Sequence, residues 1–217
     1  ISNNSTNEDY ATIKYNTNGV QQWVAIYQDT LPWWGIGFSY GLAINNSGDV
    51  YENLGTINGT NLDWGTIKYD ANGVQQWIAN YNGSGNGLDH GWDIVSDTLG
   101  NVYVTGWSWN GNNDDYVTIK YNANGTQQWA AVYNGSGDST DLAFDIDLDN
   151  IGNVYVTGMS YNGANYDYTT IKYNTNGLQQ WVEIYNGIAD SSDGASAIAV
   201  DDSGNVYVTG ASNTAPI

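Results

Sequence analysis

The sequence predicts an all-β fold, a four-bladed β-propeller with four-stranded blades of about 52 residues. Three observations lead to this prediction: a phrase that occurs four times, turn residues at fixed offsets, and an aromatic, glycine-rich composition. The 217 residues include 27 Gly, 18 Tyr and 10 Trp but only 2 Phe, which favours β-structure with many turns. A hydrophobic content of 41 % is enough to bury a core.

The repeated phrase defines the unit of the fold. "TIKYNTNGVQQW" starts at residue 12, and near-copies start at 66, 118 and 170, so consecutive copies are 54, 52 and 52 residues apart. A second phrase, "GNVYVTG", starts at 100, 152 and 204, and a degenerate form, "GDVYENLG", starts at 48. One supersecondary unit is therefore repeated four times.

Each unit reads as four short antiparallel strands. A first segment such as "AFDIDLD" (143–149) leads through a turn into "NVYVTG", which is rich in β-branched and aromatic residues. "DYVTIKYN" and "QQWAAVYN" follow, joined by an Asn-Gly pair that supplies the positive φ of a tight hairpin. These four strands are typical of a propeller blade.

The chain ends supply half a blade each. Residues 9–28 contain only the last two strands of a unit, and residues 194–212 contain only the first two. We therefore expect a single domain over 1–217, with continuous blades at about 37–82, 89–134 and 141–186 and a mixed blade made from both termini. Closing the ring in this way would remove unpaired sheet edges.

The segment "DGASAIAVDDSGNVYVTG" (193–210) resembles the hallmark of the SBBP (β-propeller) repeat family, and the other units are similar with departures. The first unit, "GFSYGLAINNSGDVYENLG", diverges most. The resemblance implies a propeller and, because such repeats occur mostly in exported bacterial and archaeal proteins, an extracellular or cell-surface location. It implies no common activity.

All four basic side chains occupy one position of the repeated phrase. We expect structural ion pairs there, with carboxylates of the same or the adjacent blade, because the chain has 23 acidic residues and each lysine follows one of them by five positions. The alternative is a ring of lysines that binds a ligand. The lysines are Lys14, Lys68, Lys120 and Lys172, and the acids are Asp9, Asp63, Asp115 and Asp167. The tryptophans of "QQW", at 23, 77, 129 and 181, are expected to pack in the core or between blades.

Composition argues against several classes of function. The formal net charge of −19 repels nucleic acid and anionic membranes, and no apolar run is long enough to span a bilayer. The single histidine, His90, has no nucleophile at a recognised spacing, and the chain contains no cysteine and no arginine. Two carboxylates could hydrolyse a glycoside, but in so acidic a chain such a pair would arise by chance. We therefore predict a protein that is not an enzyme and needs no cofactor.

One acidic segment is a candidate metal site. Strand alternation in "DIDLDN" would place Asp145, Asp147 and Asp149 on one face, and Ca²⁺ prefers such oxygen ligands. The other units do not repeat the cluster. The alternative interpretation assigns Asp149 to a turn and Asp145 to a lysine.

The connections between blades, and those between the second and third strands, are expected at one end of the propeller. They vary between copies and carry tryptophans, and binding residues often lie on such loops. The candidate ligand-binding residues are Trp33, Trp34, Trp107 and Trp109, with Trp64 and Trp92 at strand starts. Aromatic rings beside amides and carboxylates suit a glycan or a protein partner, and they suit loop packing equally. We therefore predict a secreted binding or adhesion module that contacts a glycan or a cell-surface protein. The alternative is a structural subunit of a surface layer or filament, formed by self-assembly.

Overall fold

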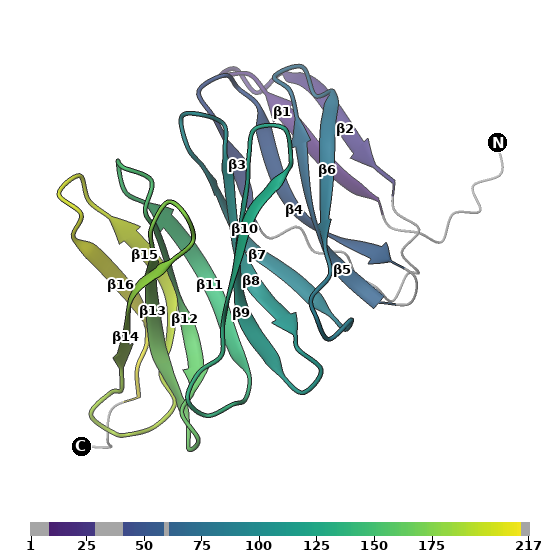
Figure 1. Ribbon diagram of the computed structural model, residues 1–217. Coiled ribbons are helices and arrows are strands. Elements are labelled where there is room, and N and C mark those ends of the chain that lie inside the picture. The colour runs from purple at the N-terminus through teal and green to yellow at the C-terminus, as the bar shows by residue number, and fades with distance from the viewer. Residues whose placement is uncertain (1–8, 29–40, 59–60, 214–217) are drawn as a thin grey trace.

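The chain forms a row of antiparallel β-sheets (Figure 1). The computed structural model describes residues 9–28, 41–58 and 61–213, and over these residues it contains strands, turns and loops but no helix. The described residues accordingly include no helix long and apolar enough to cross a membrane. The predicted all-β class is confirmed.

Three of the sheets are complete four-stranded blades, in which each strand pairs with the next strand of the chain. Blade 1 contains β3 (Leu42–Ile44), β4 (Val50–Asn58), β5 (Asn61–Tyr69) and β6 (Gln75–Tyr81). Blade 2 contains β7 (Asp89–Ser96), β8 (Val102–Trp109), β9 (Asp114–Tyr121) and β10 (Gln127–Tyr133). Blade 3 contains β11 (Asp141–Leu148), β12 (Val154–Tyr161), β13 (Tyr166–Tyr173) and β14 (Gln179–Tyr185).

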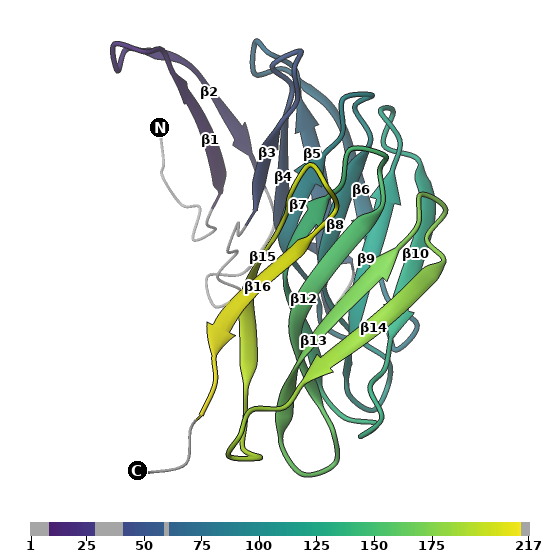
Figure 2. The same cartoon turned by 90° about the vertical axis from the view of Figure 1, so that its left-hand side faces the viewer.

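Two further sheets have two strands each. The N-terminal hairpin consists of β1 (Tyr10–Tyr15) and β2 (Gln21–Tyr27), and the C-terminal hairpin consists of β15 (Gly194–Val200) and β16 (Val206–Ala211). These hairpins are the two halves of the predicted mixed blade, but they are separate sheets, and both views show them apart (Figures 1 and 2). Each is attached to its neighbouring blade instead: Tyr10 donates to Gly55 O at 3.1 Å, and Ile198 N donates to Asp145 at 2.6 Å. The joining of the two hairpins into one sheet stays a prediction.

The hydrophobic core lies between neighbouring sheets. One cluster joins Tyr51 and Trp64 of blade 1 to the β8 and β9 strands of blade 2, and a second joins Tyr103 and Tyr116 of blade 2 to blade 3. A third joins the N-terminal hairpin to blade 1. Because each sheet covers the face of the next, the second and third strands of the complete blades are almost entirely buried, as in β9 and β12.

The turn between the third and fourth strands has the predicted chemistry. In blade 2, Asn122 O accepts from Gly125 N at 2.9 Å, and the side-chain oxygen of Asn122 accepts from the backbone of Asn124 and Thr126 at 3.0 Å each. Gly125 has a φ of 79°, a conformation that glycine adopts without the clash a Cβ would cause. The Asn-Gly prediction is confirmed, and it fixes the position of the tryptophan contact described below.

Candidate functional site

The two ends of each blade differ, and we name them the turn end and the loop end. The turn end carries the two tight turns of each blade, for example residues 97–101 and 122–126 of blade 2. The loop end carries the connections between blades (82–88, 134–140 and 186–193) and those at 110–113 and 162–165. Although the interblade loops differ in sequence, they share one hydrogen bond, which runs from a glycine N–H to the carboxylate of the aspartate six residues later. The pairs are Gly83 with Asp89, Gly135 with Asp141 and Gly187 with Asp193. Sequence variation there does not produce a new loop shape.

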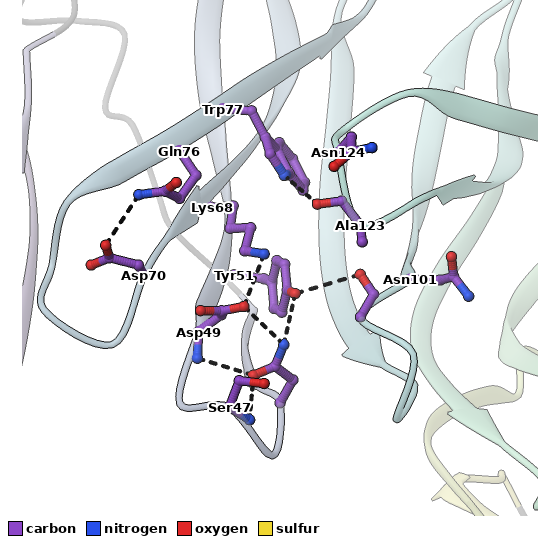
Figure 3. Close-up of polar contacts among 12 residues, drawn as sticks. Ser47, Asp49, Tyr51, Lys68, Asp70, Gln76, Trp77, Asn101, Ala123 and Asn124 are labelled. Carbon is purple, nitrogen blue, oxygen red and sulfur yellow. Dashed lines mark hydrogen bonds and ion pairs between the residues drawn. The ribbon is translucent and has the colours of Figure 1, made fainter.

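At the turn end a repeated contact, which we call the Trp clasp, holds each blade to the next. Trp77 Nε1 of blade 1 donates to Ala123 O of blade 2 at 3.0 Å (Figure 3). The Trp77 ring lies over the turn so closely that a Cβ added to Gly125 would lie 2.6 Å from it. In the same way, Trp23 Nε1 donates to Ala71 O and its ring lies over Gly73. Trp129 Nε1 likewise donates to Thr175 O and its ring lies over Gly177. The expected interblade role of these three tryptophans is confirmed.

The lysines do not form the predicted ring of ion pairs. In the described part of the chain only Lys68 has a salt bridge, with Asp49 at 2.9 Å. Lys120 and Lys172 lie over the rings of Tyr103 and Tyr155, 5.0 and 4.8 Å from the ring centroids. The exposed Lys14 donates to Ala71 O at 3.1 Å.

The acids five positions upstream cannot reach the lysines. Along an extended strand, five residues span about 16 Å and end on the opposite face. The carboxylates of Asp115 and Asp167 instead accept from Asn110 at 2.8 Å and Asn162 at 2.7 Å in loop-end connections. Lys120 and Lys172 therefore form no ion pair with these upstream acids, and among the described residues no other carboxylate of the same or the adjacent blade forms a salt bridge with them, so the predicted pairs are wrong at these two positions.

Blade 1 has its ion pair because an acid and an amide have exchanged places. In blade 2 the acid is Asp97, which accepts from Tyr103 at 3.2 Å and from the amide of Asn101 at 2.7 Å. In blade 1 the amide is Asn45 and the acid is Asp49, and Asn45 donates to Asp49 at 3.1 Å and to Tyr51 at 3.0 Å. The exchange moves the carboxylate to the position that Lys68 reaches (Figure 3). Burial would raise the pKa of Asp49, but the hydrogen bonds from Lys68 and Asn45 bring that pKa below its ordinary value.

The aspartates proposed as a metal site have other partners. Asp145 accepts from Ile198 N at 2.6 Å and Asp147 accepts from Val200 N at 2.7 Å, so both bind the first strand of the next sheet. Asp149 lies in the β11–β12 turn and accepts from Tyr155 at 3.0 Å. No group of three His, Asp or Glu side chains suited to a metal occurs in the described ranges. We therefore correct the calcium interpretation to one of blade attachment and turn formation.

Asp93, in blade 2, occupies the position that corresponds to Asp145. It accepts from Ile146 N at 3.3 Å and lies beside Asp145. Burial, followed by the proximity of Asp145, raises the pKa of Asp93 to about 7. At neutral pH the Asp93 carboxyl is therefore only partly ionised.

An aromatic group lies near the loop end, where β7, β8 and β11 meet. We name it the aromatic cluster; it consists of His90, Trp92, Trp107 and Phe144, all half-buried. His90 stacks on Trp107 with ring centroids 4.6 Å apart and an interplanar angle of 8°, and Trp92 lies 5.3 Å from Trp107 and 5.4 Å from Phe144. Burial lowers the pKa of His90 to about 4, so its imidazole is neutral at pH 7.

The cluster contains two of the six predicted ligand-binding tryptophans, Trp92 and Trp107. Trp64 is fully buried between blades 1 and 2, where a Cβ on Gly91 would lie 2.1 Å from its indole nitrogen, so it belongs to the core. Trp109 packs against Gly87 of an interblade loop, with a Cβ there 2.3 Å from its ring. Trp33 and Trp34 lie outside the described residues.

Sequence reasoning missed His90 and Phe144 as members of this group. A usable signal was present, because residues 52 positions apart occupy equivalent places in successive units. Trp107 corresponds to Met159 and Ala211, and His90 corresponds to Leu142 and Gly194. These two members therefore occupy positions that the repeat leaves variable, whereas Trp92 and Phe144 are 52 residues apart and occupy the same position of blades 2 and 3.

Comparison with family models agrees with this fold. Residues 180–217 match the model of the SBBP family, described as a beta-propeller repeat, which confirms the predicted resemblance. A search of curated proteins found no match. A similar solved structure is titled "Crystal structure of the eukaryotic initiation factor"; it is 10 % identical with a TM-score of 0.47, over 82 % of this chain and 43 % of that chain. This chain thus spans less than half the length of that neighbour.

Proposed function

We propose that the chain is a non-enzymatic, extracellular binding module whose loop end contacts a glycan or a protein partner. The aromatic cluster supports this proposal most directly. In the repeats the same side chains recur where they hold blades together, whereas His90 and Trp107 of the cluster occupy positions where the other blades carry residues of a different type. Residues that the scaffold does not require are available for recognition.

The chemistry of the cluster suits either ligand. Half-buried indole rings offer apolar surface to a sugar face or to an apolar side chain. His90 is neutral at pH 7, so it brings no charge to the apolar rings around it. Protein contacts would use the same rings, because tryptophan is enriched in interfaces.

Binding to an array of soluble glycans tests the glycan form of the proposal. We expect Trp107→Ala to reduce binding at least tenfold, and the matched control Met159→Ala, at the equivalent position of blade 3, to leave it unchanged. Equal melting temperatures for the two variants would separate loss of binding from loss of fold. Equal loss in both variants would refute a role for the cluster, and release of reducing ends from a bound polysaccharide would favour an enzyme.

A second function, a self-assembling structural subunit, is favoured by a different observation. Ile13, Tyr15 and Tyr207, on the strands at the free edges of the two hairpins, are 43 %, 56 % and 60 % exposed. Large apolar side chains on an open sheet edge promote pairing with another chain. Light scattering at micromolar concentration tests this function: a particle that stays near the 23.6 kDa chain mass would refute it.

A further inference from the structure

Three features of the two hairpins point to one missing neighbour. The first is strand pairing. In the described part of the chain, β1 pairs only with β2 and β16 pairs only with β15. In blade 3 the corresponding strands, β12 and β13, pair with each other along their whole length. The C-terminal hairpin is therefore the first half of a blade, and the N-terminal hairpin is the second half.

Exposed side chains mark the same edges. The hairpin residues Ile13, Tyr15 and Tyr207 are at least 43 % exposed, whereas the residues at the corresponding positions of blade 3 are at most 2 % exposed. These blade 3 residues are Ile171, Tyr173 and Tyr155. The two hairpins thus carry the side chains of a blade interior without the neighbouring sheet that covers them in the complete blades.

The second feature is a contact between the two turns of a blade. A Cβ added to Gly152 would lie 3.4 Å from the Thr175 side chain, and Gly48 and Gly100 lie against Ala71 and Ala123 in the same way. Gly204 occupies the equivalent position of the C-terminal hairpin, but no described atom would lie within 4 Å of its Cβ. The residue that corresponds to Thr175 is Thr17, because "TIKYNTNG" occurs identically at 170–177 and 12–19.

The third feature is an incomplete Trp clasp at each end. Trp129 donates to Thr175 O at 3.2 Å and lies over Gly177, whereas no described carbonyl accepts from Trp181 Nε1. Conversely, Gly19 has a φ of 75°, as the clasped glycines do, yet no described atom would lie within 4 Å of a Cβ there. Trp181 has no turn for its indole to contact, and the turn that contains Gly19 has no tryptophan over it. The two residues could therefore form one Trp clasp with each other.

We infer that the N-terminal hairpin of a second copy of this chain docks beside the C-terminal hairpin and completes the blade. The pairing of β12 with β13 gives the register: Thr209 opposite Thr12 and Tyr207 opposite Lys14 of the second copy. The second copy's Lys14 then lies over the Tyr207 ring, as Lys172 lies over Tyr155. This inference rests on the proposed self-assembly function and specifies its interface.

The occupant is a second copy rather than the chain's own hairpin, because the two hairpins of one chain are separate sheets attached to different blades (Figures 1 and 2). Blade 1 holds the N-terminal hairpin through the Trp23 clasp, and blade 3 holds the C-terminal hairpin through Asp145. Each copy would give one edge and receive another. A head-to-tail contact of this kind that does not close on itself builds an open filament.

Disulfide trapping tests the interface, and the chain has no cysteine that could interfere. In blade 3 the hydroxyls that correspond to Thr209 and Thr12, those of Thr157 and Thr170, lie 3.0 Å apart, so cysteines at these positions are close enough to bond. When Thr12→Cys and Thr209→Cys single variants are mixed under mild oxidation, we expect a disulfide-linked dimer. The double variant should give a ladder of multimers.

The controls make the outcomes distinct. Ile13→Cys with Thr209→Cys is one residue out of register and should react at least tenfold more slowly, because the side chains then point to opposite faces. Lys14→Cys with Tyr207→Cys repeats the test at exposed positions, in case Thr12→Cys disturbs its bond to Glu52. A double variant that bonds only within one chain, or that does not bond, would overturn the inference. If light scattering still showed multimers, the structural-subunit function would stand with a different interface.

Discussion

The closeness of Trp77 to Gly125 predicts a large effect from adding one methyl group. Gly125→Ala would introduce a Cβ at a φ of 79°, and that Cβ would lie 2.6 Å from the indole ring. The left-handed backbone costs a non-glycine residue about 1–2 kcal/mol. Forcing an extra methyl group into a packed contact costs about 1–3 kcal/mol. We therefore expect Gly125→Ala to lower the free energy of unfolding by about 2–5 kcal/mol.

A double-mutant cycle separates the two contributions. In a Trp77→Ala background the ring is absent, so Gly125→Ala should cost only the backbone strain of about 1–2 kcal/mol. Gly19→Ala is a matched control within the same chain, because Gly19 has nearly the same φ and no described atom within 4 Å of an added Cβ. Urea unfolding followed by circular dichroism, at concentrations where light scattering gives a monomer, measures all four variants. If Gly125→Ala cost the same with and without Trp77, the Trp clasp would not be the packed contact described here.

Two further predictions concern charge. The raised pKa of Asp93 means that the folded protein keeps a proton that the unfolded chain releases between about pH 4 and pH 7, so this group makes stability fall as pH rises through that window. Asp93→Asn should remove this loss of stability with rising pH and raise the free energy of unfolding at pH 8 by about 1–3 kcal/mol, because the amide oxygen still accepts from Ile146 N. Unfolding curves with the same pH dependence in the variant and the wild type would contradict this. Lys68→Met should cost about 1 kcal/mol more than Lys120→Met, because it leaves Asp49 without its cation. The difference should shrink in 1 M salt, and equal melting temperatures at low salt would show that the ion pair contributes nothing.

Much of the fold could be predicted because its determinants are local and repeated. The Asn-Gly turns and the alternation in "TIKY" specify hairpins from neighbouring residues alone, and each occurs four times. The periodic tryptophans also indicated interblade packing. What the sequence could not show was the acceptor of each indole, the backbone carbonyl of a turn 46 or 48 residues further along the chain.

The site was harder to predict because it depends on spacing across strands and between sheets. Asp115 and Lys120 appear paired in sequence, but a strand separates them along its length. Asp145 and Asp147 do share a face, yet their carboxylates bind backbone N–H groups of the next sheet, a partner that leaves no mark in the sequence. Phe144 reaches Trp92 and Trp107 only through the packing of blade 2 on blade 3.

The exchanged acid and amide of blade 1 also restrict how the repeats can diverge. Asn45→Asp alone would place two carboxylates within hydrogen-bonding reach of each other, since Asn45 and Asp49 are now 3.1 Å apart. Asp49→Asn alone would leave the turn without a carboxylate and Lys68 without its partner. Both arrangements are stable, but each single substitution between them passes through a less stable protein. The two positions must therefore change together, and a mutation accepted in one blade need not be accepted at the equivalent position of another.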